Sequence, residues 1–316
     1  QSKKFKIKNK FILSETNDKK NFLEYINFQK FKIIYFLDYG SQSILYLKLL
    51  LNKNKKSYFG IANKELIIAS GNLLTKKFRT SNNKIIPLDS EHFSLMNNNF
   101  DNSKIQKIFI TASGGPFYFN KKINLHKVDF KDVIKHPKWK MGINNSIDSS
   151  NFINKIFEVY ELSNIYNIDI KKIDFLISKE AFIHSIILYN DGTYHMNCFQ
   201  NDMIITLIKP LRFFFKLNKF KPKKNILFKN FNFKIEEFKD KRFKITKYKN
   251  YLLNLSHEKQ IIFMLLNNKA HDLYINNKLK YNDILDYIVS NLKSYKESIK
   301  FKNFDDIYKF IQKNIF

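Results

Sequence analysis

Three carboxylates form the strongest candidate for chemistry in this 316-residue sequence. Asp89 and Glu91 lie two residues apart, so in an extended segment their side chains point to the same side. Glu158 lies in a region whose apolar spacing predicts a helix. A site made of carboxylate oxygens suits Mg²⁺ or Mn²⁺ rather than zinc. The Asp-Ser-Glu run is also typical of a helix cap or a solvated turn, so the residues alone leave both interpretations open.

A second group lies within residues 136–158, which read HPKWKMGINNSIDSSNFINKIFE. The stretch begins with a polar loop that holds the only tryptophan, Trp139. A helix is predicted to start at residues 148–150, whose side chains accept hydrogen bonds from first-turn N–H groups. Hydroxyls and a lysine at a helix start suit an anion, and Glu158 further along can hold a cation beside it. A capped surface helix is the alternative interpretation.

The composition is strongly basic, with a net charge of +28. Lysines are scattered along the whole chain, together with abundant Asn, Ile, Phe and Tyr, as expected from drift in an AT-rich genome. No nucleic-acid partner is therefore predicted, although positive potential would attract phosphorylated ligands. No apolar run is long enough to span a bilayer, so no membrane partner is predicted either. The single cysteine, Cys198, excludes an internal disulfide, fits a reducing compartment and is predicted to be buried.

Strands alternate with helices in the first part of the chain, which predicts a mostly parallel sheet with crossovers. The predicted strands are residues 32–37, 57–62 and 84–88, with a further short strand at 11–13, and the predicted helices are residues 17–25, 44–51 and 66–78.

The later part of the chain has a different pattern. Strands are predicted at residues 107–112, 173–178, 183–189 and 193–199. Asn190-Asp191-Gly192 predicts a hairpin between the last two and thus an antiparallel edge. Residues 209–249 lack a clear period and are interpreted as a linker with short strands. The remainder predicts a small helical bundle, with helices near 256–275, 282–295 and 304–315.

Five motifs occur in order: ANKE (62–65), DSEH (89–92), SGGPF (113–117), HPxWxMG (136–142) and S-x4-N-K-x2-E (149–158). Together they resemble 1-deoxy-D-xylulose 5-phosphate reductoisomerase, an enzyme of the methylerythritol phosphate route to isoprenoids. The resemblance is close over about residues 60–203. It implies a partial Rossmann-like NADPH-binding α/β domain (1–88), an α+β catalytic domain (89–208), a linker (209–252) and a C-terminal α-helical domain (253–316).

The resemblance implies that NADPH and Mn²⁺ or Mg²⁺ serve the rearrangement and reduction of the sugar phosphate to 2-C-methyl-D-erythritol 4-phosphate. The implied metal ligands are Asp89, Glu91 and Glu158. Lys64 and Glu91 are the implied catalytic residues, with Lys64 placed to assist proton movement. The implied substrate-binding residues are Lys64, Ser90, Glu91, Ser113, His136, Trp139, Ser149, Asn154, Lys155 and Glu158. Asn63, Lys64, Glu65 and Gly142 are the implied cofactor-binding residues, and Trp139 belongs to a lid.

The sequence also departs from the family pattern. The family's glycine-rich turn, which resembles GSTGSIG, would lie upstream of residue 1, so the chain is expected to be truncated at its N-terminus. One family histidine is lost at residues 178–181, and family arginines are replaced by Tyr118 and Ile204. His184, in FIHS, is interpreted as structural. An inactive or partial relative that binds sugar phosphate or acts as a structural subunit is the alternative hypothesis.

The resemblance also implies a homodimer. The expected location is a bacterial cytoplasm, possibly that of an endosymbiont, or a plastid-type organelle.

Overall fold

A computed structural model describes residues 6–96, 98, 101–134, 142–213, 233–296 and 298–315. The first part of the chain forms a three-stranded parallel sheet in the order β1-β2-β3. Its strands are β1 (Ile33–Phe36), β2 (Tyr58–Ile61) and β3 (Lys84–Pro87). The helices of this part are α1 (Thr16–Phe28), α2 (Ile44–Lys53), α3 (Lys64–Ser70) and α4 (Asn72–Ser81). The predicted strand and helix alternation is confirmed here.

A second, five-stranded sheet has the order β7-β6-β4-β5-β8. Its strands are β4 (Ile105–Ala112), β5 (Ile173–Ser178), β6 (Ile183–Tyr189), β7 (Tyr194–Cys198) and β8 (Ile235–Glu237). β4 runs parallel to β5, and the other pairs are antiparallel. The predicted hairpin between β6 and β7 is confirmed, and β7 is an edge of the sheet.

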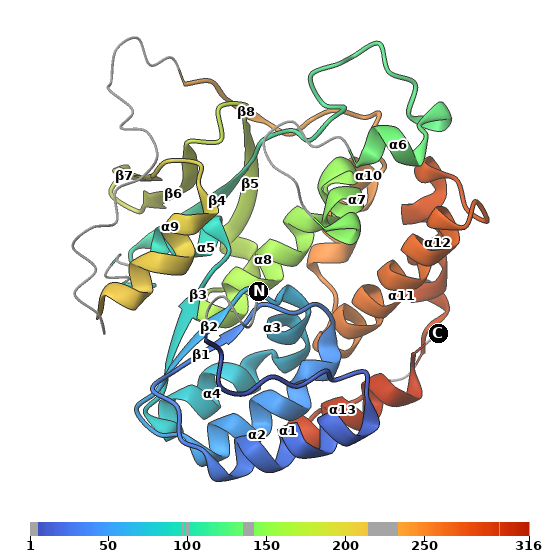
Figure 1. Ribbon diagram of the computed structural model, residues 1–316. Coiled ribbons are helices and arrows are strands. Elements are labelled where there is room, and N and C mark those ends of the chain that lie inside the picture. Colours follow the sequence, from blue (N-terminus) through green and yellow to red (C-terminus); the bar gives the residue numbers. More distant parts are fainter. Residues whose placement is uncertain are drawn as a thin grey trace.

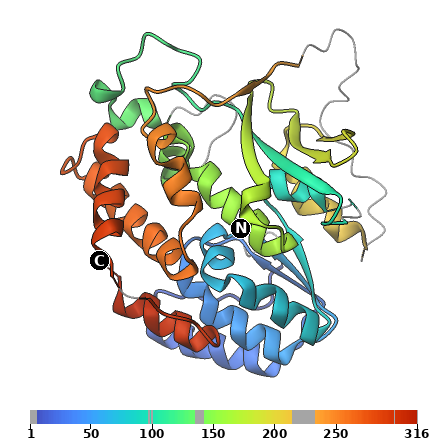
Figure 2. The same ribbon diagram turned by 180° about the vertical axis from the view of Figure 1, so that it is seen from behind.

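Helices join and cover the two sheets. Figure 1 shows α8 at the centre of the molecule, with β4, β5 and β6 on one side and α11 and α12 on the other. Figure 2 gives the same arrangement from behind. The longer helices are α7 (Ile143–Asn151), α8 (Ile153–Tyr166), α10 (Ile245–Leu253), α11 (His257–Ile275), α12 (Ile284–Ser294) and α13 (Phe304–Lys313). The short ones are α5 (Ser90–Leu95), α6 (Phe130–Val133) and α9 (Met203–Ile208), with 3₁₀ turns η1 (Ser41–Ser43), η2 (Leu125–Lys127), η3 (Ile170–Lys172), η4 (Lys209–Phe213) and η5 (Tyr281–Asp283).

One hydrophobic core runs through both sheets and the helices. Phe59 of β2, Phe175 of β5, Tyr160 of α8 and Phe263 of α11 are each at most 1% exposed. None of the helices formed by the described residues combines the length and the apolar character needed to cross a membrane. The predicted fold class, an α/β part, an α+β part and a helical C-terminal part, is confirmed.

The predicted helix start at residues 148–150 is wrong. These residues lie inside α7, which begins at Ile143, and the chain turns between α7 and α8 at Phe152. Phe152 has the left-handed conformation, with φ +69°. A non-glycine residue rarely adopts this conformation. Its ring is held by Phe238 and Phe243, at centroid distances of 4.3 and 4.9 Å, so tertiary packing overrides the local preference.

Three further predictions of local structure are wrong. Residues 11–13 form no strand, and the predicted helix over 66–78 is divided at Gly71, whose φ is +50°. The predicted linker ends in a helix, since α10 begins at Ile245. The helix is hard to recognise because its lysines obscure the apolar spacing, and Ile245 and Leu252 are its only fully buried residues.

Candidate active site

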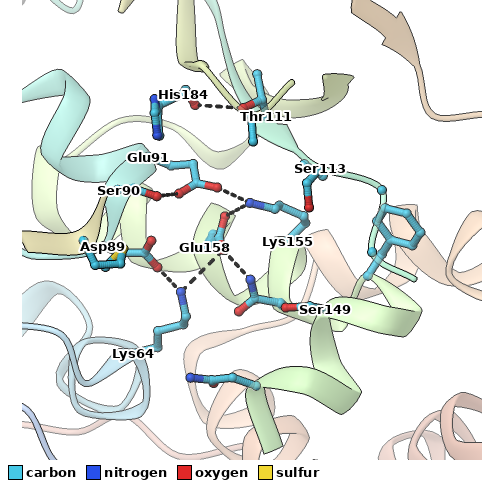
Figure 3. Close-up of a pocket in the computed structure, with 18 of the residues that line it drawn as sticks. Lys64, Asp89, Ser90, Glu91, Thr111, Ser113, Ser149, Lys155, Glu158 and His184 are labelled. Atoms are coloured by element: carbon cyan, nitrogen blue, oxygen red, sulfur yellow. Dashed lines mark hydrogen bonds and ion pairs between the residues drawn. The ribbon is translucent and has the colours of Figure 1, made fainter. Parts of the chain in front are cut away.

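The two sheets meet at a cavity of about 290 Å³. β3 leads into it through Leu88 and Asp89, and β4 through Ser113 and Gly114. Ligand sites in α/β folds lie outside the carboxyl ends of strands in this way. α8 contributes Asn154, Lys155 and Glu158 to the wall of the cavity. Figure 3 shows that polar side chains from all these elements converge.

The three predicted carboxylates come together in the cavity. Asp89, Glu91 and Glu158 each offer one oxygen, and these atoms lie within 4.8 Å of one another. The segment is not extended as predicted, because Asp89 is the N-cap of α5 and Glu91 lies in its first turn. Ser90 donates a hydrogen bond to Glu91. Convergence from two helices gives a set of oxygen ligands of the kind that Mg²⁺ and Mn²⁺ prefer.

Two lysines pair with these carboxylates (Figure 3). Lys64 pairs with Asp89, and its Nζ lies 3.4 Å from Oε1 of Glu158. Lys155 pairs with Glu91, and its Nζ lies 2.5 Å from Oε2 of Glu158. The five side chains are between 2% and 14% exposed. Three carboxylates facing two ammonium groups leave a net negative charge when all are ionised, which favours a cation.

The pKa values of the two glutamates move in opposite directions. Burial alone would raise the pKa of Glu91, but the adjacent Lys155 lowers it to about 2. Burial raises the pKa of Glu158, and the neighbouring Glu91 raises it further. Burial lowers the pKa of Lys155, but Glu158 and Glu91 raise it overall, so Lys155 stays charged. Of these two glutamates, Glu158 therefore binds a proton more readily than Glu91 does.

The predicted anion-binding residues lie on the adjoining wall. Ser113 and Ser149 line the same cavity as Asn154 and Lys155. Asn154 donates a hydrogen bond to Glu158 and thus connects this wall to the carboxylates. Gly115, with φ +59°, lets the turn approach α7 closely, since a Cβ there would lie 2.9 Å from the carbonyl oxygen of Ser149.

The predicted cofactor residues lie around a second cavity of about 500 Å³. It shares Ala62, Lys64 and Asn145 with the first cavity, so the two adjoin. Glu65 and Gly142 line it directly. Asn63 is buried instead and caps α3 by accepting a hydrogen bond from the Leu66 N–H at 2.8 Å. Burial and the nearby Asp148 raise the pKa of Glu65 to about 7.

Two predicted substrate-binding residues, His136 and Trp139, lie outside the described residues. His184 is 4% exposed and stacks on Phe199 at a centroid distance of 3.8 Å, and it also lines the first cavity. The prediction that Cys198 is buried is wrong, since it is exposed on the edge strand β7.

Two buried residues behind the carboxylates were not singled out from the sequence. His92 is fully buried, and its Nε2 lies 2.9 Å from the carbonyl oxygen of Glu158. Its Nδ1 lies 3.7 Å from Oε2 of Glu161, which is also fully buried. The feature of the sequence that could have identified Glu161 is its spacing from Glu158, which places both side chains on one face of a helix.

Comparison with known proteins gives a consistent result. Residues 85–166 match the family model of the 1-deoxy-D-xylulose 5-phosphate reductoisomerase C-terminal domain. A 1-deoxy-D-xylulose 5-phosphate reductoisomerase of Pelagibacter ubique is 34% identical over 255 residues, covering 78% of this chain and 65% of the relative. A second, from Malacoplasma penetrans, is 34% identical over 250 residues, covering 77% and 64%. The chain thus spans slightly less than two thirds of the length of these relatives.

Solved structures share the fold. The reductoisomerase of Zymomonas mobilis in complex with NADPH has a TM-score of 0.75 at 21% identity, covering 94% of this chain and 76% of that one. A reductoisomerase in complex with NADPH, fosmidomycin and magnesium has a TM-score of 0.79 at 20% identity, covering 94% and 77%. The chain is therefore a relative of the 1-deoxy-D-xylulose 5-phosphate reductoisomerases, as the five motifs predicted.

Proposed function

We propose that this chain catalyses the NADPH- and divalent-metal-dependent conversion of 1-deoxy-D-xylulose 5-phosphate to 2-C-methyl-D-erythritol 4-phosphate, a step of isoprenoid precursor synthesis. The observation that carries the proposal is the convergence of three carboxylates and two lysines in one cavity beside a serine- and glycine-lined wall. A phosphorylated sugar offers the two kinds of group that such a site needs. Its carbonyl and hydroxyl oxygens suit a cation, and its phosphate suits hydroxyl and ammonium donors.

The residues fit a hard divalent cation. Asp89, Glu91 and Glu158 supply oxygen ligands only, within 4.8 Å of one another, as Mg²⁺ or Mn²⁺ requires. When bound, such an ion polarises substrate oxygens and stabilises negative charge that develops on them. Lys64 and Lys155 neutralise the same carboxylates in the structure and thereby keep them close together.

The side chains of this chain hold and move protons around the substrate. In the proposal, Lys64 lies beside the substrate hydroxyls and stabilises the oxygen that loses its proton. Ser113, Ser149, Asn154 and Lys155 bind the phosphate. Glu91, with its lowered pKa, stays ionised as the substrate changes charge. His136 and Trp139 remain proposed substrate contacts, with Trp139 in a lid that excludes water.

The second cavity fits the nicotinamide end of NADPH. Its apolar wall includes Leu37, Tyr39, Ile143 and Ile275, and such a wall suits a flat ring. Polar groups at Glu65 and Asn144 can fix the orientation of an amide. Because the two cavities adjoin, a ring held here would face a sugar bound in the first one.

The proposal extends to the domains, the assembly and the location of the protein. The domains proposed from the sequence are residues 1–88 for the cofactor, 89–208 for catalysis and 253–316 for the helical part, with 209–252, which includes most of α10, as the connection. We propose a homodimer, and a bacterial cytoplasm as the location because the relatives are bacterial.

The test is oxidation of NADPH followed by absorbance with Mn²⁺ and 1-deoxy-D-xylulose 5-phosphate. Glu158→Gln keeps the size of the side chain and removes the charge, so substrate-dependent oxidation should fall at least about 100-fold. Glu237→Gln, on the exposed residue of β8, should keep full activity. If the folded wild-type chain binds the substrate but oxidises no NADPH, the alternative of an inactive relative replaces this proposal.

A further inference from the structure

α7 carries two kinds of residue on different faces. Asn145 and Ser149, four residues apart, share one face and line the cavity. Asp148 lies on another face and is 4% exposed. A buried carboxylate one residue from Ser149, which we assign to phosphate binding, would repel a phosphate unless its charge is compensated.

The compensation comes from α11. Asn267 Nδ2 donates hydrogen bonds to both carboxylate oxygens of Asp148, at 2.9 and 3.1 Å. His271 Nε2 lies 2.8 Å from Oδ1 of Asp148 and donates to it, because an ionised carboxylate only accepts. Asn267 is 1% and His271 0% exposed, so water does not replace these bonds.

Among the described residues, no lysine or arginine pairs with this carboxylate. Within the part of the chain that the structure describes, the His271 ring is the one basic side chain within 4.0 Å of the Asp148 carboxylate. The charge of Asp148 acts on groups around it, since it contributes to the raised pKa values of Glu65 and Tyr39. The hydrogen bonds from Asn267 and His271 are therefore the means by which this carboxylate is directed away from the cavity.

We propose that Asn267 and His271 are positioning residues for phosphate binding. They hold the Asp148 carboxylate on the α11 side of α7, keep its charge from the anion and fix Ser149 and Asn145 in the wall of the cavity. The inference rests on the proposed function, because it assumes that this wall binds the substrate phosphate. In this proposal the helical C-terminal part contributes to the affinity for the anion but not to the affinity for the metal.

The test compares two substitutions at one position. His271→Met removes the donor and keeps a side chain of similar length. His271→Gln keeps a donor, because its Nε2 can take the place of the histidine Nε2. Calorimetric titrations measure inorganic phosphate and, separately, Mn²⁺. We expect His271→Met to weaken phosphate binding about tenfold, the effect of one partly screened charge, with Mn²⁺ affinity within twofold of wild type. His271→Gln should bind both within threefold of wild type.

A double substitution distinguishes charge from a general loss of structure. If the Asp148 charge is the cause, Asp148→Asn in the His271→Met background restores much of the phosphate affinity, although it removes a further native group. If His271→Met fails to fold, Asn267→Leu replaces it, again with and without Asp148→Asn.

Equal phosphate affinity in wild type and His271→Met, parallel losses of phosphate and Mn²⁺ affinity, or no recovery in the double variant would overturn the inference. A wild-type chain that binds no phosphate would be a different failure, since it would overturn the proposed substrate site and the inference with it.

Discussion

The ammonium group of Lys64 is paired with the carboxylate of Asp89, although the two residues begin different helices, α3 and α5. The lysine thus pairs with one of the carboxylates proposed to bind the metal. A divalent cation held by the same oxygen of Asp89 would compete with Lys64 for it, and would free the lysine for the substrate hydroxyls of the proposed reaction. The relationship makes the affinity for the proposed metal and the position of Lys64 interdependent.

Replacing Lys64 by Gln should therefore increase the affinity for Mn²⁺ in the absence of substrate. A charge-assisted hydrogen bond contributes about 1.5 kcal/mol or more, so an increase of about tenfold is expected. Turnover should nevertheless be lost. Calorimetry with Mn²⁺ measures the first effect, with Lys76→Gln on the exposed side of α4 as the control. Unchanged or weaker Mn²⁺ binding would show that Lys64 does not compete for Asp89.

Glu161 should make the stability of the metal-free protein depend on pH. Burial raises the pKa of Glu161 to about 8 from 4.5, and neither of its oxygens has a hydrogen-bond partner among the described residues. Because the folded-state pKa is raised, the stabilising contribution is complete below about pH 4.5 and is lost as pH rises toward 8. Within this window the loss approaches about 1.4 kcal/mol per pH unit.

Glu161→Gln imitates the neutral carboxyl group and removes the titration. Urea unfolding in the presence of a chelator should give similar stabilities for wild type and variant near pH 5, and a more stable variant at pH 8.5. Glu24→Gln, exposed on α1, controls for the loss of one charge. Parallel curves for wild type and Glu161→Gln would contradict the assignment.

Arg242 connects a distant segment to the turn that follows Ser113-Gly114-Gly115. Its guanidinium donates to the carbonyl oxygens of Phe117, Tyr118 and Asn120 at 3.3, 3.1 and 2.9 Å. Arg242→Met should lower the free energy of unfolding by about 2–3 kcal/mol, since these carbonyls lose a charged donor. The exposed neighbour Lys241→Met should change it by less than about 0.5 kcal/mol. Equal stabilities for the two variants in urea would refute the role.

Gly115 and Gly192 form a matched pair, because both have positive φ, at +59° and +84°. Gly192→Ala should cost about 1–2 kcal/mol for backbone strain alone, as nothing lies within 4 Å of its new Cβ. Gly115→Ala should cost more and also weaken phosphate binding, because its Cβ would meet the Ser149 carbonyl oxygen at 2.9 Å. Thermal unfolding and phosphate titration measure the two effects. Equal losses of stability and of phosphate affinity in the two variants would mean that the close contact between the Gly115 turn and α7 is not required.

The sequence predicted the features that depend on local pattern. Alternating strands and helices, the hairpin at residues 190–192 and the helices of the C-terminal part follow from periodicity and turn residues. The association of Asp89, Glu91 and Glu158 was predictable only through the order of the five motifs, since Glu91 and Glu158 are 67 residues apart in the sequence.

Features that depend on tertiary packing were not predictable. Phe152 adopts a left-handed conformation against its local preference because aromatic side chains from residues 238 and 243 enclose it. The partners of Asp148 lie more than 100 residues away on α11, where nothing in the sequence pairs them. The pairing of Lys64 with Asp89 was not predictable either, because it depends on how the starts of α3 and α5 meet in the fold.

The cavity lies where the carboxyl ends of strands from both sheets meet, with β3 leading to Asp89 and β4 to Ser113. A ligand that contacts both residues therefore links the two sheets, which share no hydrogen-bonded strand pair among the described residues. Its binding would therefore restrain the movement of the two sheets relative to each other. Amide exchange should slow in β3 and β4 together when the cavity is filled, although each strand belongs to a different sheet.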